Sequence, residues 1–116
     1  MSAAFTLTFQ NDMGRLRAAY GTLVFSGNYT GTGGDTLDLT NKGILASKPP
    51  VYGEIEGQAG FKYEWSPGTT LANGKVKVRI NDAGGANAPM AEHSAAALVA
   101  GVTGDTISAR FVFAKE

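Results

Sequence analysis

Three glutamates lie close together in the sequence and have the residue type needed for acid–base chemistry. Glu54, Glu56 and Glu64 fall on two neighbouring runs of alternating polar and apolar residues, and a glycosidase needs two carboxylates that flank one bond. The same alternation predicts that all three share the solvent face of a β-hairpin with Lys62 and Lys77. We therefore expect these glutamates to form exposed cross-strand ion pairs, which is a structural role.

Other residues with catalytic or metal-binding potential occur without the rest of a site. His93 precedes Ser94, but no G-x-S-x-G elbow surrounds the serine, so we expect a solvated or interface histidine. The segment "GTGGDT" lacks the lysine of a phosphate-binding loop. Asp35 and Asp38 lack EF-hand spacing and are expected to be solvated. We predict a protein that is not an enzyme and that binds no cofactor or metal.

Composition and charge exclude several classes of protein. The 116 residues include no cysteine and a single histidine, which excludes disulfides, cysteine-based zinc sites and multi-histidine metal sites. The formal net charge is zero at pH 7, whereas a nucleic-acid-binding domain usually has a basic footprint. We recognise no signal peptide and no membrane-spanning run. Because zero net charge permits association, the composition favours a protein that works within an assembly.

The most distinctive stretch of the chain is "FKYEWSPGTTLANGKVKVRI", residues 61 to 80. Phe61, Tyr63 and Trp65 alternate with charged residues there and could form a platform that stacks sugars or bases. Period-two alternation places the three rings on one face with the apolar residues of the next strand, Val76, Val78 and Ile80. Because so apolar a face is normally covered, we predict that the three rings belong to the core.

Register arguments predict a three-stranded meander over residues 51 to 80. A loop at residues 57–59 would place Gly53 opposite Tyr63, where the missing side chain leaves room for the ring. The same loop would place Glu54 opposite Lys62 on the other face. The second hairpin is expected to form the pairs Tyr63–Val78, Trp65–Val76 and Glu64–Lys77.

Alternation elsewhere predicts further short strands at residues 5–9, 19–25, 35–40 and 105–113, separated by glycine-rich turns. This pattern is typical of an all-β fold, and we predict a small antiparallel β-sandwich or β-barrel, immunoglobulin-like or jelly-roll-like. Residues 14–116 would form the single β domain. Residues 1–13 would form an extended N-terminal arm, and residues 81–104 a long Ala/Gly-rich loop.

Three segments together resemble small virion proteins of tailed bacteriophages: "GGDTLDLT", the meander, and the closing "TISARFVFAKE". The similarity covers residues 20 to 116 and is one of patterning. It implies a head structural protein, most of all a capsid decoration (cement) protein that binds the outside of the major capsid protein lattice, commonly as a homotrimer. Such a protein is made in the host bacterial cytoplasm and ends on the capsid surface of the virion.

Two other functions remain open at this point. One is a different virion component, such as a tail, head-fibre or baseplate protein. The other is a carbohydrate-binding β-sandwich module, which requires Trp65 or Tyr52 to be exposed beside polar groups.

A decoration protein would need contact residues, and two segments offer them. "FTLTF" could add a strand to a neighbouring sheet, and the Ala/Gly-rich segment could order on a partner surface. We expect the major capsid protein and other copies of the chain as partners, and neither nucleic acid nor a membrane. The predicted contact residues are Phe5, Leu7, Phe9, Met90, His93 and Leu98.

Overall fold

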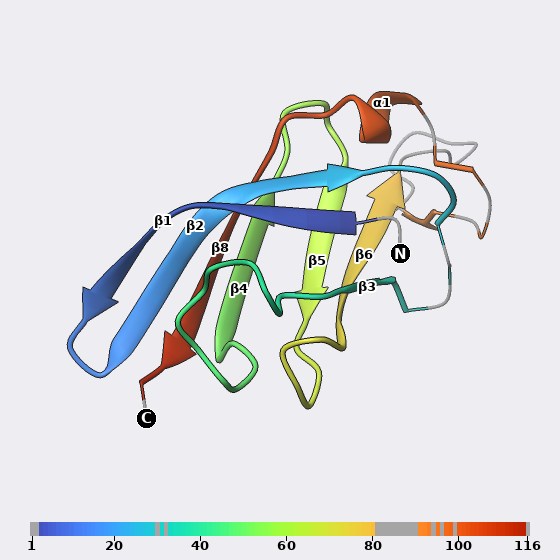
Figure 1. Ribbon diagram of the computed structural model, residues 1–116. Helices are drawn as coiled ribbons and strands as arrows, with labels where there is room; N and C mark the ends of the chain where they lie inside the picture. Colours follow the sequence, from blue (N-terminus) through green and yellow to red (C-terminus); the bar gives the residue numbers. More distant parts are fainter. Residues whose placement is uncertain are drawn as a thin grey trace.

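The computed structural model describes residues 3–29, 31, 33–80, 91–93, 95, 97–98 and 100–115. Within them the chain forms eight strands and one short helix (Figure 1). These are β1 (Ala3–Met13), β2 (Leu16–Phe25), β3 (Asp35–Leu37), β4 (Tyr52–Glu56), β5 (Lys62–Ser66), β6 (Gly74–Ile80), β7 (Ala91–Glu92), α1 (Ala100–Thr103) and β8 (Ile107–Ala114).

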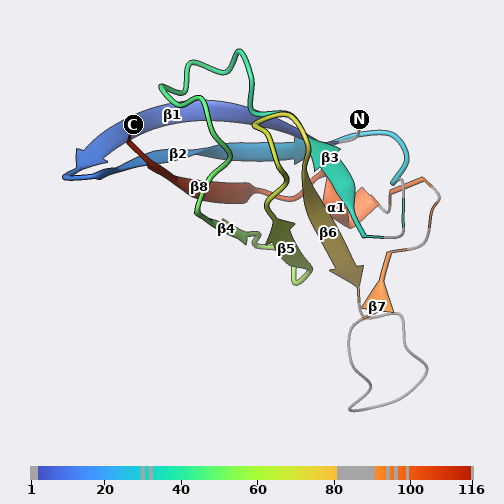
Figure 2. The same ribbon diagram turned by 90° about the horizontal axis from the view of Figure 1, so that it is seen from below.

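The strands form two antiparallel sheets. The first sheet has the order β1-β2-β8-β4, and the second has the order β3-β6-β5, with β7 also paired to β6. Figure 2 shows the second sheet running beneath one end of the longer first sheet. The molecule is therefore mostly β, and its two sheets are compatible with the predicted small sandwich. No helix among the described residues is long and apolar enough to cross a membrane.

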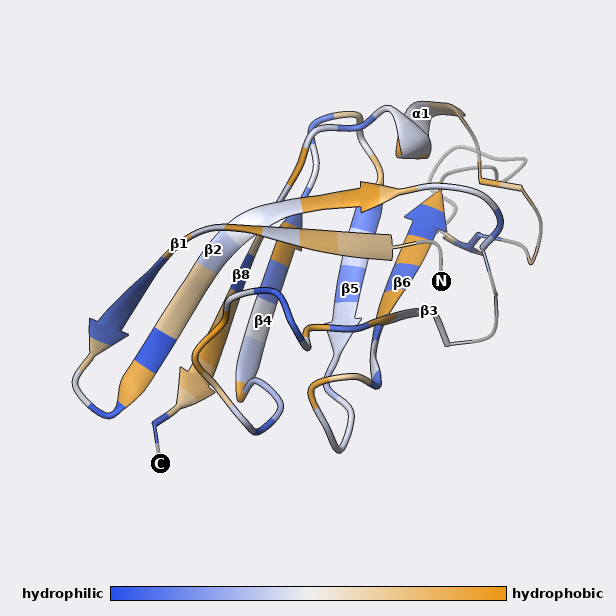
Figure 3. Ribbon diagram, in the orientation of Figure 1, coloured by the Kyte–Doolittle hydropathy of each residue, from blue (hydrophilic) through white to orange (hydrophobic). Residues whose placement is uncertain are grey.

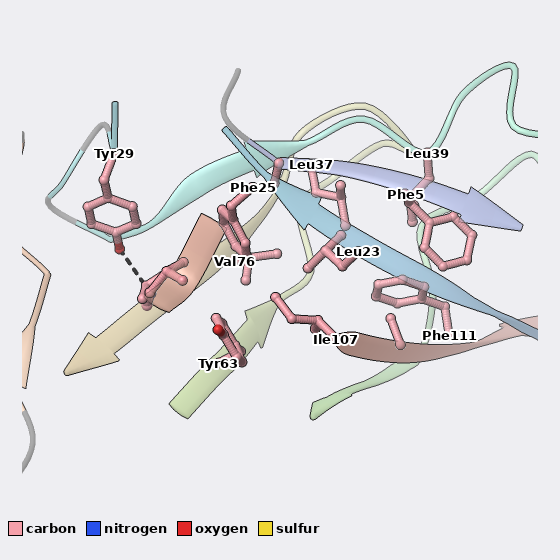
Figure 4. Packing of buried hydrophobic residues seen from close by; sticks show 14 of the residues in the cluster. Phe5, Leu23, Phe25, Tyr29, Leu37, Leu39, Tyr63, Val76, Ile107 and Phe111 are labelled. Atoms are coloured by element: carbon pink, nitrogen blue, oxygen red, sulfur yellow. Dashed lines mark hydrogen bonds between the residues drawn. The ribbon is translucent and has the colours of Figure 1, made fainter. Parts of the chain in front are cut away.

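The core lies between the two sheets and is built from aromatic contacts (Figure 4). Phe25 of β2 stacks on Tyr63 of β5 with ring centroids 5.7 Å apart. Phe111 of β8 meets Trp65 of β5 edge-on at 4.8 Å. Tyr63 is only 5% exposed, and Phe61 and Trp65 are partly buried against the same cluster. The prediction that the aromatic stripe belongs to the core is thus confirmed.

The predicted meander is half correct. The β5–β6 hairpin has the predicted register, with the pairs Tyr63–Val78, Trp65–Val76 and Glu64–Lys77. The first hairpin is wrong, because β4 pairs with β8 in the other sheet and places Gly53 opposite Phe111. Alternation correctly predicts which side of a strand is buried, but two strands that share a core need not share a sheet.

Gly53 does make room for an aromatic ring, although not for the predicted one. A Cβ atom at Gly53 would lie 2.4 Å from Cδ1 of Trp65, and one at Gly74 would lie 2.1 Å from its Cη2. The indole therefore packs across the sandwich against Gly53 of β4 and within its own sheet against Gly74 of β6. The sequence indicates that Gly53 leaves room for a ring, but it does not indicate which ring lies there.

The segment predicted to be an N-terminal arm forms a strand instead. Apart from residues 1–2, which lie outside the described part, this segment is strand β1, and it pairs with β2 along its length. Phe5 is 2% exposed and meets Phe111 edge-on at 5.4 Å. Burial of this ring holds β1 against the rest of the molecule. The segment is therefore the edge strand of the first sheet and not a separate arm. The register shifts between Leu7 and Phe9.

The Ala/Gly-rich segment is described in part, and residues 81–90, 94, 96 and 99 lie outside that part. The described remainder packs on the sandwich. Strand β7 pairs with β6, Ala97 bridges to Asn28, and the Leu98 N–H donates to the Gly27 carbonyl at 3.0 Å. The short helix α1 lies at the end of this segment, with Val102 fully buried.

Candidate functional site

The solvent side of the first sheet carries five of the seven large apolar side chains that are exposed in the described part of the chain. Strand alternation buries Ala19, Leu23 and Ala109 on the inner side, so their neighbours along the chain point outward. We call this surface the outer face. Five large apolar side chains on it are more than a third exposed: Phe9, Met13, Leu16, Val24 and Tyr52.

One line of cross-strand neighbours on the outer face, the aromatic row, consists of Phe9, Tyr20, Arg110 and Glu54. The rings of Phe9 and Tyr20 stack at 4.5 Å with an interplanar angle of 17°. Arg110 Nη2 lies 3.5 Å from Glu54 Oε1, and its Cζ lies 5.6 Å from the Tyr52 ring centroid. A hydrogen bond with Tyr20, followed by the charge of Glu54, holds the pKa of Arg110 above its usual value. This row therefore holds a guanidinium by aromatic and carboxylate contacts.

The adjacent line, the hydroxyl row, consists of Thr6, Thr22, Ser108 and Glu56. Small side chains occupy three of its four positions, so the surface is hollowed beside the Tyr20 ring. The hollow has a volume of about 280 Å³ and is lined by Tyr20, Gly21, Glu54, Glu56, Ser108, Ala109 and Arg110. Two carboxylates and one guanidinium thus border a single shallow concavity.

The predicted contact residues fall in very different places. Phe5, His93 and Leu98 are buried, at 2%, 4% and 8% exposure, so their side chains belong to the core and not to a contact surface. Leu7 is partly buried against the core. Phe9 is 50% exposed and belongs to the outer face. Met90 lies outside the described residues.

His93 is buried because β7 adds to the second sheet. Its backbone N–H donates to the Val78 carbonyl at 2.8 Å, and its ring lies 5.4 Å from that of Tyr29. The Tyr29 hydroxyl in turn donates to Glu92 Oε2 at 2.6 Å. The expectation of a solvated or interface histidine is therefore wrong, because the surroundings of the residue come from strands distant in sequence.

Glu54, Glu56 and Glu64 do not share a face, contrary to the expectation from the sequence. Glu64 accepts a hydrogen bond from Arg79 at 2.9 Å and lies 3.6 Å from Lys62, and the Arg79 contact lowers its pKa. Glu54 belongs to the other sheet and pairs with Arg110, not with Lys62. The structural role expected for Glu64 is confirmed, whereas Glu54 and Glu56 border the hollow on the outer face.

Asp35 and Asp38, which lack the spacing of a calcium-binding EF-hand, have different surroundings. Asp35 is fully buried in the second sheet, which corrects the expectation of a solvated side chain. Asp38 accepts hydrogen bonds from the backbone N–H and hydroxyl of Thr40, which lower its pKa. Among the described residues, no three histidine, aspartate or glutamate side chains are grouped as metal ligands.

Asp105 is a residue that the sequence analysis missed. Its carboxylate accepts hydrogen bonds from the backbone N–H groups of Gln58 and Ala59, at 2.9 and 3.0 Å, and from the Tyr63 hydroxyl at 2.7 Å. It thereby ties the segment before β8 to the β4–β5 loop and to the core. The sequence "GDT" that precedes β8 marks a possible turn but does not indicate these partners.

No known protein family, curated protein or solved structure matches this chain. The function of the outer face must therefore be argued from its own chemistry.

Proposed function

We propose that this chain is a structural protein of the bacteriophage virion, a decoration protein that binds the outside of the major capsid protein lattice and stabilises the shell. The observation that carries the proposal is the exposure of five large apolar side chains on one face of the first sheet. Exposed apolar side chains gathered on one face of a domain mark surfaces for protein partners. The resemblance of the sequence to small virion proteins supplies the kind of partner.

The shape of the outer face supports a protein partner of large area. The exposed side chains are spread over β1, β2 and β4, and the one concavity described on this face is shallow. A cement protein needs moderate contacts that are repeated many times over a shell, because multivalency turns weak contacts into durable attachment. On the capsid surface, contacts with other copies in a trimer would add to this effect.

The edge of the first sheet offers a second kind of contact. Strand β1 is 11 residues long, contains neither lysine nor proline, and has no described strand on its outer side. Edge strands are usually protected by such residues, and an unprotected edge can accept an added strand. The proposed strand addition by "FTLTF" uses its backbone and does not need the Phe5 side chain, which is buried. Within the two-sheet architecture, an immunoglobulin-like or jelly-roll-like topology stays a prediction.

A capsid-binding experiment tests this proposal. Purified chain is mixed with expanded capsids that lack it, and the bound fraction is measured by co-sedimentation. The double variant Phe9→Ser/Tyr52→Ser should bind at least about tenfold more weakly, because it removes two apolar contacts from the outer face. Lys77→Ser, on the opposite face of the molecule, serves as the matched control and should bind as the original chain does.

Two results would refute the proposal. One is absence of the chain from purified virions by mass spectrometry, together with no binding to capsids. The other is equal binding by the double variant and the control. A few copies per particle instead of many would favour the tail, head-fibre or baseplate role.

A carbohydrate-binding module is the second candidate, because Tyr52 is 48% exposed beside Glu54 and Arg110. The alternative aromatic for such a module, Trp65, is partly buried against the core. Binding to a glycan array that is lost in Tyr52→Ala, with an unchanged circular dichroism spectrum, would favour this candidate over decoration.

A further inference from the structure

Both rows of the outer face end in a glutamate of β4, but the β8 residue paired with that glutamate differs. In the aromatic row, Glu54 is paired in register with Arg110, which supplies a positive charge. In the hydroxyl row, Glu56 is paired in register with Ser108, which supplies none. The Glu56 carboxylate forms no ion pair with another described residue. The second carboxylate on this strand therefore lacks the cation that the first one has.

The hollow occupies the place where that cation would lie. Its volume of about 280 Å³ is open beside the small Ser108 side chain, and its walls include the Tyr20 ring and both glutamates. Arg110 shows that a guanidinium can be held on this face, because it contacts both the Glu54 carboxylate and the Tyr52 ring. Aromatic faces and carboxylates attract lysine and arginine side chains by the same two interactions.

We propose that this hollow binds a lysine or arginine side chain presented by a partner protein. The cationic group would lie against the Glu56 carboxylate and the Ser108 hydroxyl, and the aliphatic stem would lie along the Tyr20 ring. The bound side chain would complete the hydroxyl row as Arg110 completes the aromatic row. This inference goes beyond the proposed function, because it names the chemistry of the contact and holds for a partner other than a capsid.

Charge decides between this ligand and a sugar. The side chains around the hollow carry two negative charges and one positive charge, so one negative charge is left over. A neutral sugar would cover Glu56 without compensating its charge, whereas a cationic side chain compensates it directly. The exposed apolar side chains nearby, Phe9 and Tyr52, would provide the surrounding contact area.

A titration followed by NMR of the isotope-labelled chain tests the proposal without any capsid. The probes are N-acetyl-lysine N-methylamide and, as a neutral control of similar length, N-acetyl-norleucine N-methylamide. The lysine probe should shift the amide signals around Tyr20, Glu56 and Ser108 with a Kd of roughly 1–10 mM. Its affinity should fall about threefold or more when salt is raised from about 0.02 M to about 0.5 M.

Two substitutions locate the site. Glu56→Gln removes the unmatched charge and should weaken the lysine probe about threefold or more. Glu64→Gln removes a carboxylate from the opposite side of the molecule and should change nothing. Ser108→Lys places a cation opposite Glu56 within the chain, so it should abolish probe binding while the melting temperature stays equal or rises.

Each contrary result overturns the inference. Equal shifts with the norleucine probe would mean a merely apolar hollow, and shifts with methyl β-glucoside but not lysine would mean a sugar site. No shift at about 0.1 M probe would mean no site at all. Concentration-dependent shifts at the same residues without any probe would identify a second copy of this chain as the source of the cation and overturn a separate partner.

Discussion

The solvent sides of the two sheets differ in composition, although both sheets are built from strands with alternating buried and exposed residues. The second sheet presents Lys62 and Glu64 on β5, and Lys75, Lys77 and Arg79 on β6, with Glu64 bonded to Arg79. The first sheet presents the aromatic row, the hydroxyl row and exposed Val24. Figure 3 shows hydrophilic and hydrophobic residues alternating along β6, and apolar colour at the end of β2.

The difference shows that strand alternation does not give the solvent sides of both sheets the same composition. Clear alternation of charge with apolar residues on β5 and β6 produces a well-solvated outer face and a good core, as expected for a half-buried sheet. The first sheet departs from that pattern on its solvent side. A departure of this kind costs solubility, and a partner that covers the exposed rings would offset that cost.

Two aromatic residues give the largest test of this comparison. Trp65→Ala should lower the free energy of unfolding by about 3 kcal/mol or more, because it leaves a cavity between the sheets. Tyr52→Ala, on the outer face, should change it by less than about 1 kcal/mol. Urea unfolding followed by circular dichroism measures both. Similar losses for the two variants would mean that Tyr52 also stabilises the fold and that the outer face is not simply a surface.

Two neighbouring residues of β4 give a smaller effect of the same kind. Gly53→Ala should destabilise the fold by about 1–3 kcal/mol, since the added Cβ would lie 2.4 Å from the Trp65 ring. The Glu54 side chain points to solvent, so Glu54→Ala should lower the free energy of unfolding by less than about 1 kcal/mol. Thermal unfolding of the pair checks this difference. A Gly53→Ala variant as stable as the original chain would show that the indole can move aside easily.

The hydrogen bond between the Tyr63 hydroxyl and Asp105 also predicts that the stability of the fold depends on pH. Burial, and then the hydrogen bond to Asp105, raise the pKa of Tyr63 above the ordinary value of 10.0. A hydroxyl with a raised folded-state pKa contributes stability fully below pH 10, and this contribution is lost as the pH rises further. Tyr63→Phe should therefore cost about 1 kcal/mol at pH 7 and reduce the alkaline loss.

Unfolding at pH 7 and at about pH 11 measures the alkaline effect. Tyr29 also has a raised pKa, mainly through burial, so part of the alkaline loss should remain in the Tyr63→Phe variant. An identical pH profile for the variant and the original chain would contradict the assigned role of the Tyr63–Asp105 bond.

Much of the fold could be predicted from local pattern, and most of the site could not. The strand segments, the β5–β6 register and the burial of Tyr63 all follow from period-two alternation. The placement of β4 beside β8 does not, because it depends on which strand edge meets which. The outward positions of Tyr20 and Arg110 could have been read from alternation in "AAYGTLVF" and "TISARFVF", but their pairing needed the β2–β8 register.

The sequence by itself determined an all-β chain, a core containing the aromatic stripe, and an absence of recognisable catalytic motifs. These features follow from residue type and from spacing over a few positions, which local backbone geometry converts directly into buried and exposed sides. The tertiary structure decided that Phe5 and His93 are buried, that the N-terminal segment is an edge strand, and that Glu56 borders a hollow. Each of these depends on contacts between strands distant in sequence, and alternation carries no information about which distant strands pair.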